Sequence, residues 1–406
     1  MEDSTRLLNG PSHARHCGPS AAGISGAAAS PHASDEGDLE AQAVSSTALP
    51  SAPLAGGRSN SSGRCTTSYS SYGAVGSSPR GLPRTPGPAG AAKFDAGFYL
   101  RMGGLFLLWY GLNVMYNIDN KLALIMLPLP WTVSTFQLFF GWIFFCFAWT
   151  TGLRPMPSFH SKELFFTRIV PQGFCHFLVH IGAVTSMGCG AVSFTHIIKA
   201  TEPALTAALS GVFLGQVLAW QTYLSLVPVV AGVVMASITE LSFTWMAFWC
   251  ALLSALGSSA RAVFAKRAMT NRKEVGDNLS STNMYALLTI VASLISLPLA
   301  LFAEGPVISS VWAAATSPDS PWTGVQILTK MCFSALWYYT YNEVAYLCLE
   351  KVNQVTHAVA NTVKRVVIIV ASVLFFHTPV TPLGVVGSLV AIAGTLLYSL
   401  SKTKFG

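Results

Sequence analysis

Ten apolar stretches follow one another between residues 97 and 400, and each is long enough to cross a lipid bilayer as a helix. Inside a bilayer, backbone polar groups must be satisfied within the segment, so these stretches predict helices. Only 10% of residues are charged, against about 25% in an ordinary soluble domain. The sequence therefore predicts an all-α polytopic membrane protein with spans near 97–117, 131–151, 164–187, 190–215, 220–238, 244–268, 282–302, 327–349, 352–376 and 380–400.

The first 94 residues differ from the rest because they are rich in Ser, Gly, Ala and Pro and contain no apolar block typical of a signal peptide. We expect a disordered tail over 1–94 and a membrane-spanning domain over 95–402. The acidic run Asp35–Glu40 argues against an ordinary transit peptide. A targeting tail and an untargeted solvated tail both stay open.

Loop charges predict the topology. Ten spans place both termini and every even-numbered loop on one side, and cations are concentrated there, as the positive-inside rule requires of an even count. We therefore expect both termini on the same, basic side. Its cations are Arg154, Lys162, Arg168, Lys266, Arg267, Arg272, Lys273, Lys351, Lys402 and Lys404, whereas the opposite loops offer chiefly Lys121, Glu240, Glu304 and Asp319.

A short internal repeat indicates two halves. Thr195-His196 opens a polar and cationic cluster in the fourth span, and Thr356-His357 does so in the ninth. Five spans per half is an odd number, so the halves must have opposite orientations. The expectation is two inverted five-helix repeats, about 97–238 and 244–400, with a binding site at their interface, as in secondary transporters.

Two adjacent cations, Lys364 and Arg365, lie near the middle of the ninth span. One charge at mid-membrane costs on the order of 3 kcal/mol on insertion scales, so an anionic ligand or a counter-charge is required. The pair therefore predicts an anion site, and a buried ion pair without a ligand is the alternative.

Two further cations lie inside predicted spans. Lys199 precedes Pro203, which removes a helix hydrogen bond and predicts a discontinuous helix beside a cavity. Lys199 could instead simply pair with Glu202 at i,i+3. Arg261 lies between one and two turns inside the Lys266 end of its span, from which it could also extend to the interface.

Three other residues are candidates on chemistry alone. Tyr341 is one of several tyrosines in its span, and a phenol can hydrogen-bond an anion without adding charge. His180 fits a structural histidine as well as a ligand group. Glu343 is a candidate for balancing a nearby lysine when the site is empty.

The converging cations indicate a ligand with concentrated negative charge, and phosphate fits best. Arginine supplies planar bidentate contacts and lysine a compact point charge, which suits a phosphorylated small molecule that carries a second acid group. The eight cysteines include no CxxC pair, and no motif for a metal, a cofactor, a nucleophile or a nucleic acid occurs. The expected partners are phosphate, small phosphorylated metabolites and the lipid bilayer.

Several passages resemble the plastidic phosphate translocators, the triose-phosphate/phosphate translocator group of the drug/metabolite transporter superfamily. The resemblance covers about residues 97–402. It rests on Ala191–Pro203, Met235–Phe243, Lys266–Met269, Ser281–Ala286 and Val355–Arg365.

The resemblance implies roles for individual residues. The phosphate-binding cations of the family fall on Lys199, Lys364 and Arg365, and the residues that contact the rest of the substrate fall on His180, Arg261 and Tyr341. Ala183 stands where the family has a small hydroxyl residue. This departure removes a hydrogen bond and predicts relaxed triose-phosphate selectivity that admits phosphoenolpyruvate.

The implied activity is antiport by alternating access rather than enzyme catalysis. Inorganic phosphate would exchange for triose phosphate, 3-phosphoglycerate or phosphoenolpyruvate across a plastid envelope or the membrane of an apicomplexan plastid. A nucleotide-sugar transporter of the same fold is one alternative. A polytopic membrane transferase is another, but it would need a paired-carboxylate motif that the sequence lacks. The oligomeric state and the particular plastid membrane stay open.

Overall fold

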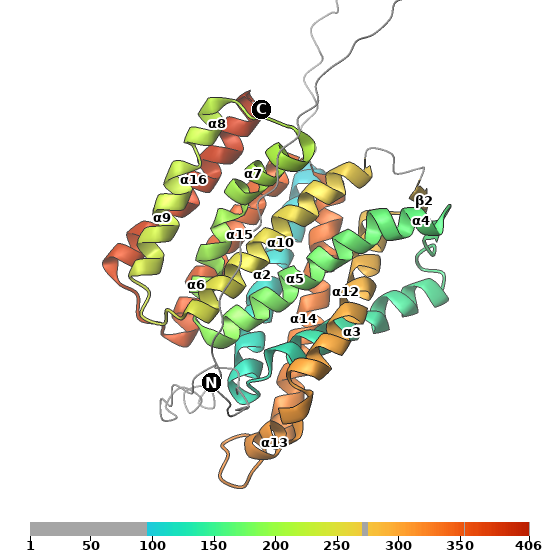
Figure 1. The fold of residues 1–406 in the computed structure, drawn as a ribbon, viewed down its shortest axis with the longest axis vertical. Helices are drawn as coiled ribbons and strands as arrows, with labels where there is room; N and C mark the ends of the chain where they lie inside the picture. The colour runs from blue at the N-terminus through green and yellow to red at the C-terminus, as the bar shows by residue number, and fades with distance from the viewer. Residues whose placement is uncertain (1–95, 270–274, 353, 406) are drawn as a thin grey trace, which may run out of the picture. The chain divides into compact units, whose positions relative to one another are not determined.

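A computed structural model describes residues 96–269, 275–352 and 354–405, and helices dominate it (Figure 1). The tail predicted over 1–94 lies outside these residues. The first half contains α2 (Ala96–Met126), α3 (Pro130–Thr150), α4 (Lys162–Leu164), α5 (Val170–Cys189), α6 (Val192–Ile198), α7 (Glu202–Leu214), α8 (Trp220–Leu224) and α9 (Val227–Ile238). The second half contains α10 (Trp245–Met269), α12 (Ser281–Ala303), α13 (Gly305–Ala315), α14 (Gly324–Lys351), α15 (Gln354–Phe376) and α16 (Pro382–Phe405).

Eight helical stretches among the described residues are long and apolar enough to cross a membrane. Helices α2 and α14, of 31 and 28 residues, cover the first and eighth predicted spans but carry polar residues such as Asp119 and Lys330. Many large apolar side chains point outward, including Phe302 with 86% of its surface exposed. The prediction of an all-α polytopic protein is confirmed, and the count of ten spans stays a prediction.

Helix packing follows a matched pattern. Helix α10 packs along α5, and α14 packs along α2; likewise α12 packs on α5, and α3 on α14. Helix α9 packs along α16. Suppose the ten predicted spans are numbered in order and span 1 is exchanged with span 6, span 2 with span 7, and so on. The α5–α10 contact then becomes the α14–α2 contact, the α5–α12 contact becomes the α14–α3 contact, and the α9–α16 contact stays the same. Such a pattern is expected of two related halves, and the repeat boundaries themselves stay a prediction.

Small residues allow α9 and α16 to approach closely. A Cβ atom on Gly232 would lie 2.4 Å from the backbone nitrogen of Ala391, and one on Gly387 would lie 2.6 Å from that of Ala236. Side chains at these two glycines would force the backbones apart. Close backbone approach through small residues is the usual way in which helices associate in lipid.

The fourth span is broken where Pro203 predicts a break. Helix α6 ends at Ile198, a 3₁₀ turn covers Lys199–Thr201, and α7 begins at Glu202 with Pro203 in its first turn. Proline lacks the N–H that would continue the hydrogen-bond ladder, so the preceding carbonyls are available to other donors. The break places Lys199 and Glu202 at the middle of the helical unit.

Three segments differ from the expectation. The connection 303–326 contains the short helix α13, because Pro306 stands in the first turn, where a missing N–H costs nothing. The predicted span 220–238 is divided into α8 and α9, with Pro228 at the start of α9. Two-residue strands, β1 (Ser158–Phe159) and β2 (Gly276–Asp277), form one antiparallel pair.

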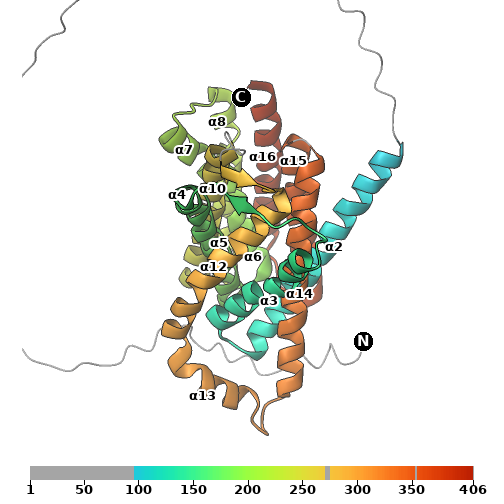
Figure 2. The same cartoon turned by 90° about the vertical axis from the view of Figure 1, so that its right-hand side faces the viewer.

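The start of α2 and the end of α16 lie at the same end of the helical unit (Figure 2). An even number of passes produces this arrangement. The side of a membrane on which these ends lie stays a prediction.

Candidate functional site

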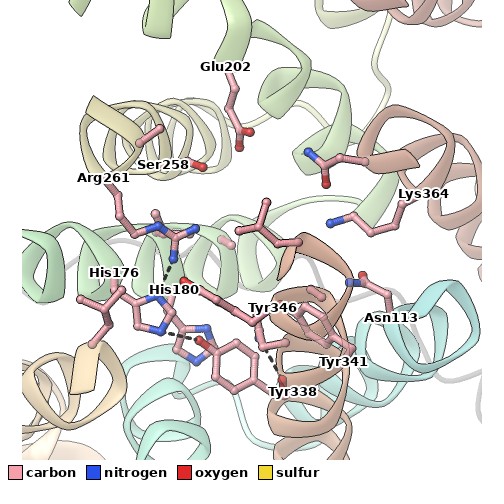
Figure 3. A pocket seen from close by; sticks show the side chains of 18 of the residues that line it. Asn113, His176, His180, Glu202, Ser258, Arg261, Tyr338, Tyr341, Tyr346 and Lys364 are labelled. Atoms are coloured by element: carbon pink, nitrogen blue, oxygen red, sulfur yellow. Dashed lines mark hydrogen bonds between the residues drawn. The ribbon is translucent and has the colours of Figure 1, made fainter. Parts of the chain in front are cut away.

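A cavity of about 430 Å³ lies between the two halves of the helical unit, lined by side chains of α2, α5, α6, α7, α10, α14 and α15 (Figure 3). Its volume is within the range of small-molecule sites. The six residues that the resemblance implies to contact substrate all line it, although they come from five different helical segments: His180, Lys199, Arg261, Tyr341, Lys364 and Arg365.

Glu202 joins two of the three cations implied to bind phosphate. Its Oε1 atom lies 3.1 Å from Nζ of Lys199, and its Oε2 atom pairs with Nη2 of Arg365. Nη1 of Arg365 also donates to the carbonyl oxygen of Lys199 at 2.6 Å, a carbonyl in the 3₁₀ turn. The alternative of a Lys199–Glu202 pair is therefore realised, and the same carboxylate links the broken fourth span to the ninth.

Lys364 has a different environment. Its Nζ atom lies 4.9 Å from the centroid of the Trp109 ring, which stacks on His357 with centroids 5.3 Å apart. No carboxylate in the described part of the chain forms an ion pair with it. The cation is supported by an aromatic face, which attracts positive charge without neutralising it.

Charge in the cavity is strongly unbalanced. Among the described lining residues, four fixed cations face a single carboxylate, Glu202. Three positive charges are therefore uncompensated by protein in a region remote from bulk solvent. An anion of two or more charges would neutralise most of this excess, and the effect is large because the local dielectric is low.

Arg261 points into the cavity rather than to the end of its helix, so the interfacial alternative is wrong. Its Nη1 atom lies 2.7 Å from Nδ1 of His176. Nε2 of the same imidazole lies 3.3 Å from the hydroxyl of Tyr338. Helices α10, α5 and α14 thus meet through one chain of hydrogen bonds.

An aromatic wall carries the other two predicted residues. The rings of His180 and Tyr338 lie 4.0 Å apart, and Tyr341 packs on Tyr116 at 5.2 Å. His180 is 3% exposed, and its Nε2 atom has no hydrogen-bond partner among the described residues. Ala183 lines the same wall. His180 therefore lines the cavity, while its Nε2 atom is buried without a partner among the described residues.

The expected role of Glu343 is wrong. Its carboxylate pairs with Arg154 and accepts a hydrogen bond from the Tyr339 hydroxyl at 3.3 Å, and it does not line the cavity. On α14 it lies two positions from Tyr341, so the two side chains point to different sides of the helix.

Polar contacts hold the last part of α2 to α14 and to the end of α5. Asp119 of α2 accepts hydrogen bonds from Lys330 at 2.7 Å and from the Trp337 indole at 3.0 Å. Lys121 donates to the carbonyl oxygen of Met187 at 2.7 Å, at the end of α5. The cavity lining extends toward β2, through residues such as Val275.

Sequence reasoning missed three lining residues that the geometry makes prominent. His176 lies one helical turn before His180, and this i,i+4 spacing was a usable signal. Tyr338 belongs to a face of α14 that includes Tyr341, Asn342, Ala345 and Tyr346 at helical spacing. Glu202 was considered only as a local partner of Lys199, because its contact with Arg365 depends on the fold.

Comparison with known proteins identifies the family. The sequence pattern of the Triose-phosphate Transporter family matches residues 100–399. The chain belongs to this family.

Similar proteins occur in plants. The chain is 40% identical to phosphoenolpyruvate/phosphate translocator 3, chloroplastic, of Oryza sativa subsp. japonica, over 75% of each chain. It is 38% identical to the triose phosphate/phosphate translocator, chloroplastic, of Flaveria trinervia, over 75% of this chain and 72% of the other. It is 36% identical to glucose-6-phosphate/phosphate translocator 2, chloroplastic, of Arabidopsis thaliana, over 75% and 76%.

All three relatives are translocators, which agrees with the predicted transporter class and leaves the membrane-transferase alternative without support. The triose-phosphate transporter family is also the group that the sequence passages resemble. The predicted resemblance is thus confirmed.

Proposed function

We propose that this chain is an antiporter that exchanges inorganic phosphate for phosphorylated three-carbon compounds across a plastid membrane by alternating access. The observation that carries the proposal is the cavity with four cations and one carboxylate, built from side chains of membrane-spanning helices. Such an excess of positive charge is costly in a membrane protein unless an anion binds there.

Lys199, Lys364 and Arg365 would hold the phosphate group. Arg365 supplies a planar pair of N–H donors, and the two lysines supply point charges, Lys199 from the 3₁₀ turn between α6 and α7 and Lys364 from α15. Phosphate is the group common to the names of all the relatives described above. Its binding would draw Lys199 and Arg365 away from Glu202.

His180, Arg261 and Tyr341 would contact the rest of the substrate. Arg261 and Lys364 approach the cavity from opposite sides (Figure 3). A ligand with phosphate at one end and an oxygen-rich group at the other fits between them. Phosphoenolpyruvate, 3-phosphoglycerate and dihydroxyacetone phosphate have this form.

The obligatory character of exchange follows from electrostatics. In the described conformation Glu202 pairs with both Lys199 and Arg365 and offsets one of their two charges, whereas Lys364 has no ion pair to a described carboxylate. Closing both ends around an empty cavity would bury this uncompensated charge, and a bound anion removes the cost. One carboxylate thus restrains two of the three cations that would hold the phosphate.

The proposed location is a plastid envelope or an apicomplexan plastid membrane, since the similar translocators are chloroplastic. Both termini would lie on the same side of that membrane. The two inverted repeats, about 97–238 and 244–400, would rock against each other around the cavity.

Competition in proteoliposomes tests the proposal. Vesicles loaded with phosphate take up radiolabelled phosphate while external competitors are added in turn: dihydroxyacetone phosphate, 3-phosphoglycerate, phosphoenolpyruvate, glucose 6-phosphate and a nucleotide sugar. Inhibition by the three-carbon compounds at lower concentrations than the others supports the proposal. Stronger inhibition by the nucleotide sugar would favour a nucleotide-sugar transporter and contradict the proposal.

A further inference from the structure

His176 is a buried imidazole that lies between two cavity-lining groups from other helices. It is 2% exposed, and its two ring nitrogens face Arg261 at 2.7 Å and the Tyr338 hydroxyl at 3.3 Å (Figure 3). The three residues come from α5, α10 and α14. Neither the sequence patterns nor the family resemblance assigns a role to His176.

The donors and acceptors in this chain have a fixed direction. A guanidinium can only donate, so Nδ1 of His176 must accept and carries no proton. The imidazole is therefore neutral, and its proton lies on Nε2, which donates to the oxygen of Tyr338. The hydroxyl hydrogen of Tyr338 then remains available to a further acceptor in the cavity.

The two cavity arginines are consequently held in different ways. Arg365 is held by the carboxylate of Glu202, which offsets its charge. Within residues 96–269, 275–352 and 354–405, Arg261 has no ion pair with a carboxylate and is held by a neutral acceptor. His176 thus fixes the guanidinium in place and leaves its full charge for a ligand.

We propose that His176 is a positioning residue that presents Arg261, and through its tautomer the Tyr338 hydroxyl, to a carboxylate on the substrate. The pocket then favours phosphorylated three-carbon acids over a triose phosphate, which has no carboxylate. This inference rests on the proposed function and adds the chemical class of the preferred substrate. An arginine that is fixed but not neutralised can bind a carboxylate through two parallel hydrogen bonds.

An isosteric pair of substitutions separates positioning from packing. The Oδ1 atom of asparagine or aspartate can occupy the place of Nδ1, so His176→Asn and His176→Asp both keep an acceptor for Arg261. Only the aspartate neutralises the guanidinium. A purely structural role of His176 would make the two variants behave alike.

The experiment measures KM for phosphoenolpyruvate and for dihydroxyacetone phosphate in phosphate-loaded proteoliposomes, with phosphate homoexchange as a measure of folded protein. The ratio compared is KM for phosphoenolpyruvate divided by KM for dihydroxyacetone phosphate. We expect this ratio to be about tenfold or more higher in His176→Asp than in His176→Asn. His176→Asn should keep the ratio within about threefold of wild type, because the neutral acceptor is retained. Equal ratios in the two variants would overturn the inference.

A third variant covers a failure of the aspartate protein to fold. His176→Leu removes the acceptor without adding charge, and the ratio of KM values should rise about fivefold or more relative to His176→Asn. An unchanged ratio in the leucine variant would likewise overturn the inference. Failure of the proposed function is distinguishable, because wild-type protein would then show no phosphate homoexchange before any variant is compared.

Discussion

The carboxylate of Glu202 lies 3.1 Å from the ammonium of Lys199, and the same carboxylate also pairs with Arg365 of α15. One acidic side chain therefore joins the two segments that supply the proposed phosphate-binding cations. A phosphate ion entering the cavity must compete with this carboxylate. The binding free energy of phosphate is then reduced by the cost of separating Lys199 and Arg365 from Glu202.

Replacing Glu202 removes the competitor. Glu202→Gln should lower KM for external phosphate about fivefold, because about 1 kcal/mol of lost competition corresponds to that factor. The maximal exchange rate should fall as well, since tighter binding slows release. Initial rates of phosphate homoexchange over a range of concentrations measure both quantities. Glu202→Asp keeps the charge and serves as the control; an unchanged or higher KM in Glu202→Gln would contradict the competition.

Arg365 should not tolerate replacement by lysine. Its guanidinium bonds both the Lys199 carbonyl and Glu202, and a lysine cannot reproduce this geometry. Arg365→Lys and Lys364→Met should each lower kcat/KM for phosphate exchange about ten- to a hundredfold, the effect of losing a charged hydrogen bond. Lys351→Met removes an exposed cation outside the cavity and is the matched control. Equal activity of Lys364→Met and Lys351→Met would argue against the proposed site.

Ala183 offers a test of substrate selectivity. It lines the cavity on the same helix as His180, and the family resemblance implies a hydroxyl at this position. Ala183→Thr should lower KM for dihydroxyacetone phosphate about three- to tenfold relative to phosphoenolpyruvate, because one added hydrogen bond contributes about 0.5–1.5 kcal/mol. Ala183→Val has nearly the same shape without the hydroxyl and is the control. The same shift in both variants would assign the effect to volume instead.

Much of the fold was predictable because the bilayer forces one structure on each apolar segment. The break before Pro203 and the convergence of Lys199, Lys364 and Arg365 followed from local chemistry. The helix α13 was missed because the residues between the predicted spans 282–302 and 327–349 were taken only as a connection. Prolines favour the first turn of helices as well, and the sequence around Pro306 does not distinguish the two cases.

The candidate site was predictable in its cations but not in their partners. Glu202 pairs with Arg365, 163 positions away, and His176 meets Arg261, 85 positions away. Such contacts depend on how α5, α10 and α15 pack, which no local pattern specifies. The error over Glu343 has the same origin, because its partner Arg154 lies in the connection after α3.

Glu304 should matter for stability and its dependence on pH. Its carboxylate accepts hydrogen bonds from the backbone N–H groups of Trp131 and Thr132, at 2.9 and 2.7 Å, and so caps the start of α3. Glu304→Ala should reduce the free energy of unfolding by about 1–2 kcal/mol, the usual effect of losing a cap. Thermal unfolding of detergent-solubilised protein measures this change, and an unchanged apparent Tm would contradict the capping role.

The sign of the pH effect follows from burial. Burial raises the pKa of the Glu304 carboxyl above its ordinary value of 4.5, although the hydrogen bonds favour the ionised form. The folded protein therefore binds more protons than the unfolded chain above pH 4.5. The stability that Glu304 contributes is full below that pH and decreases as pH rises through the folded-state pKa. The apparent Tm of wild type should exceed that of Glu304→Gln by an amount that decreases as pH rises from 4.5 through the folded-state pKa of Glu304. A difference that increases with pH would contradict the assigned direction of the pKa shift.

The central claim is that the cationic cavity changes its access from one side of the membrane to the other only with an anion bound. Uptake of radiolabelled phosphate into proteoliposomes tests it most directly, with vesicles that either contain phosphate or phosphoenolpyruvate or contain no counter-substrate. Rapid uptake into the loaded vesicles and background uptake into the empty ones is the predicted result. Substantial uptake into the empty vesicles would show that the unoccupied cavity can change its access between the two sides of the membrane, and this result would contradict the account.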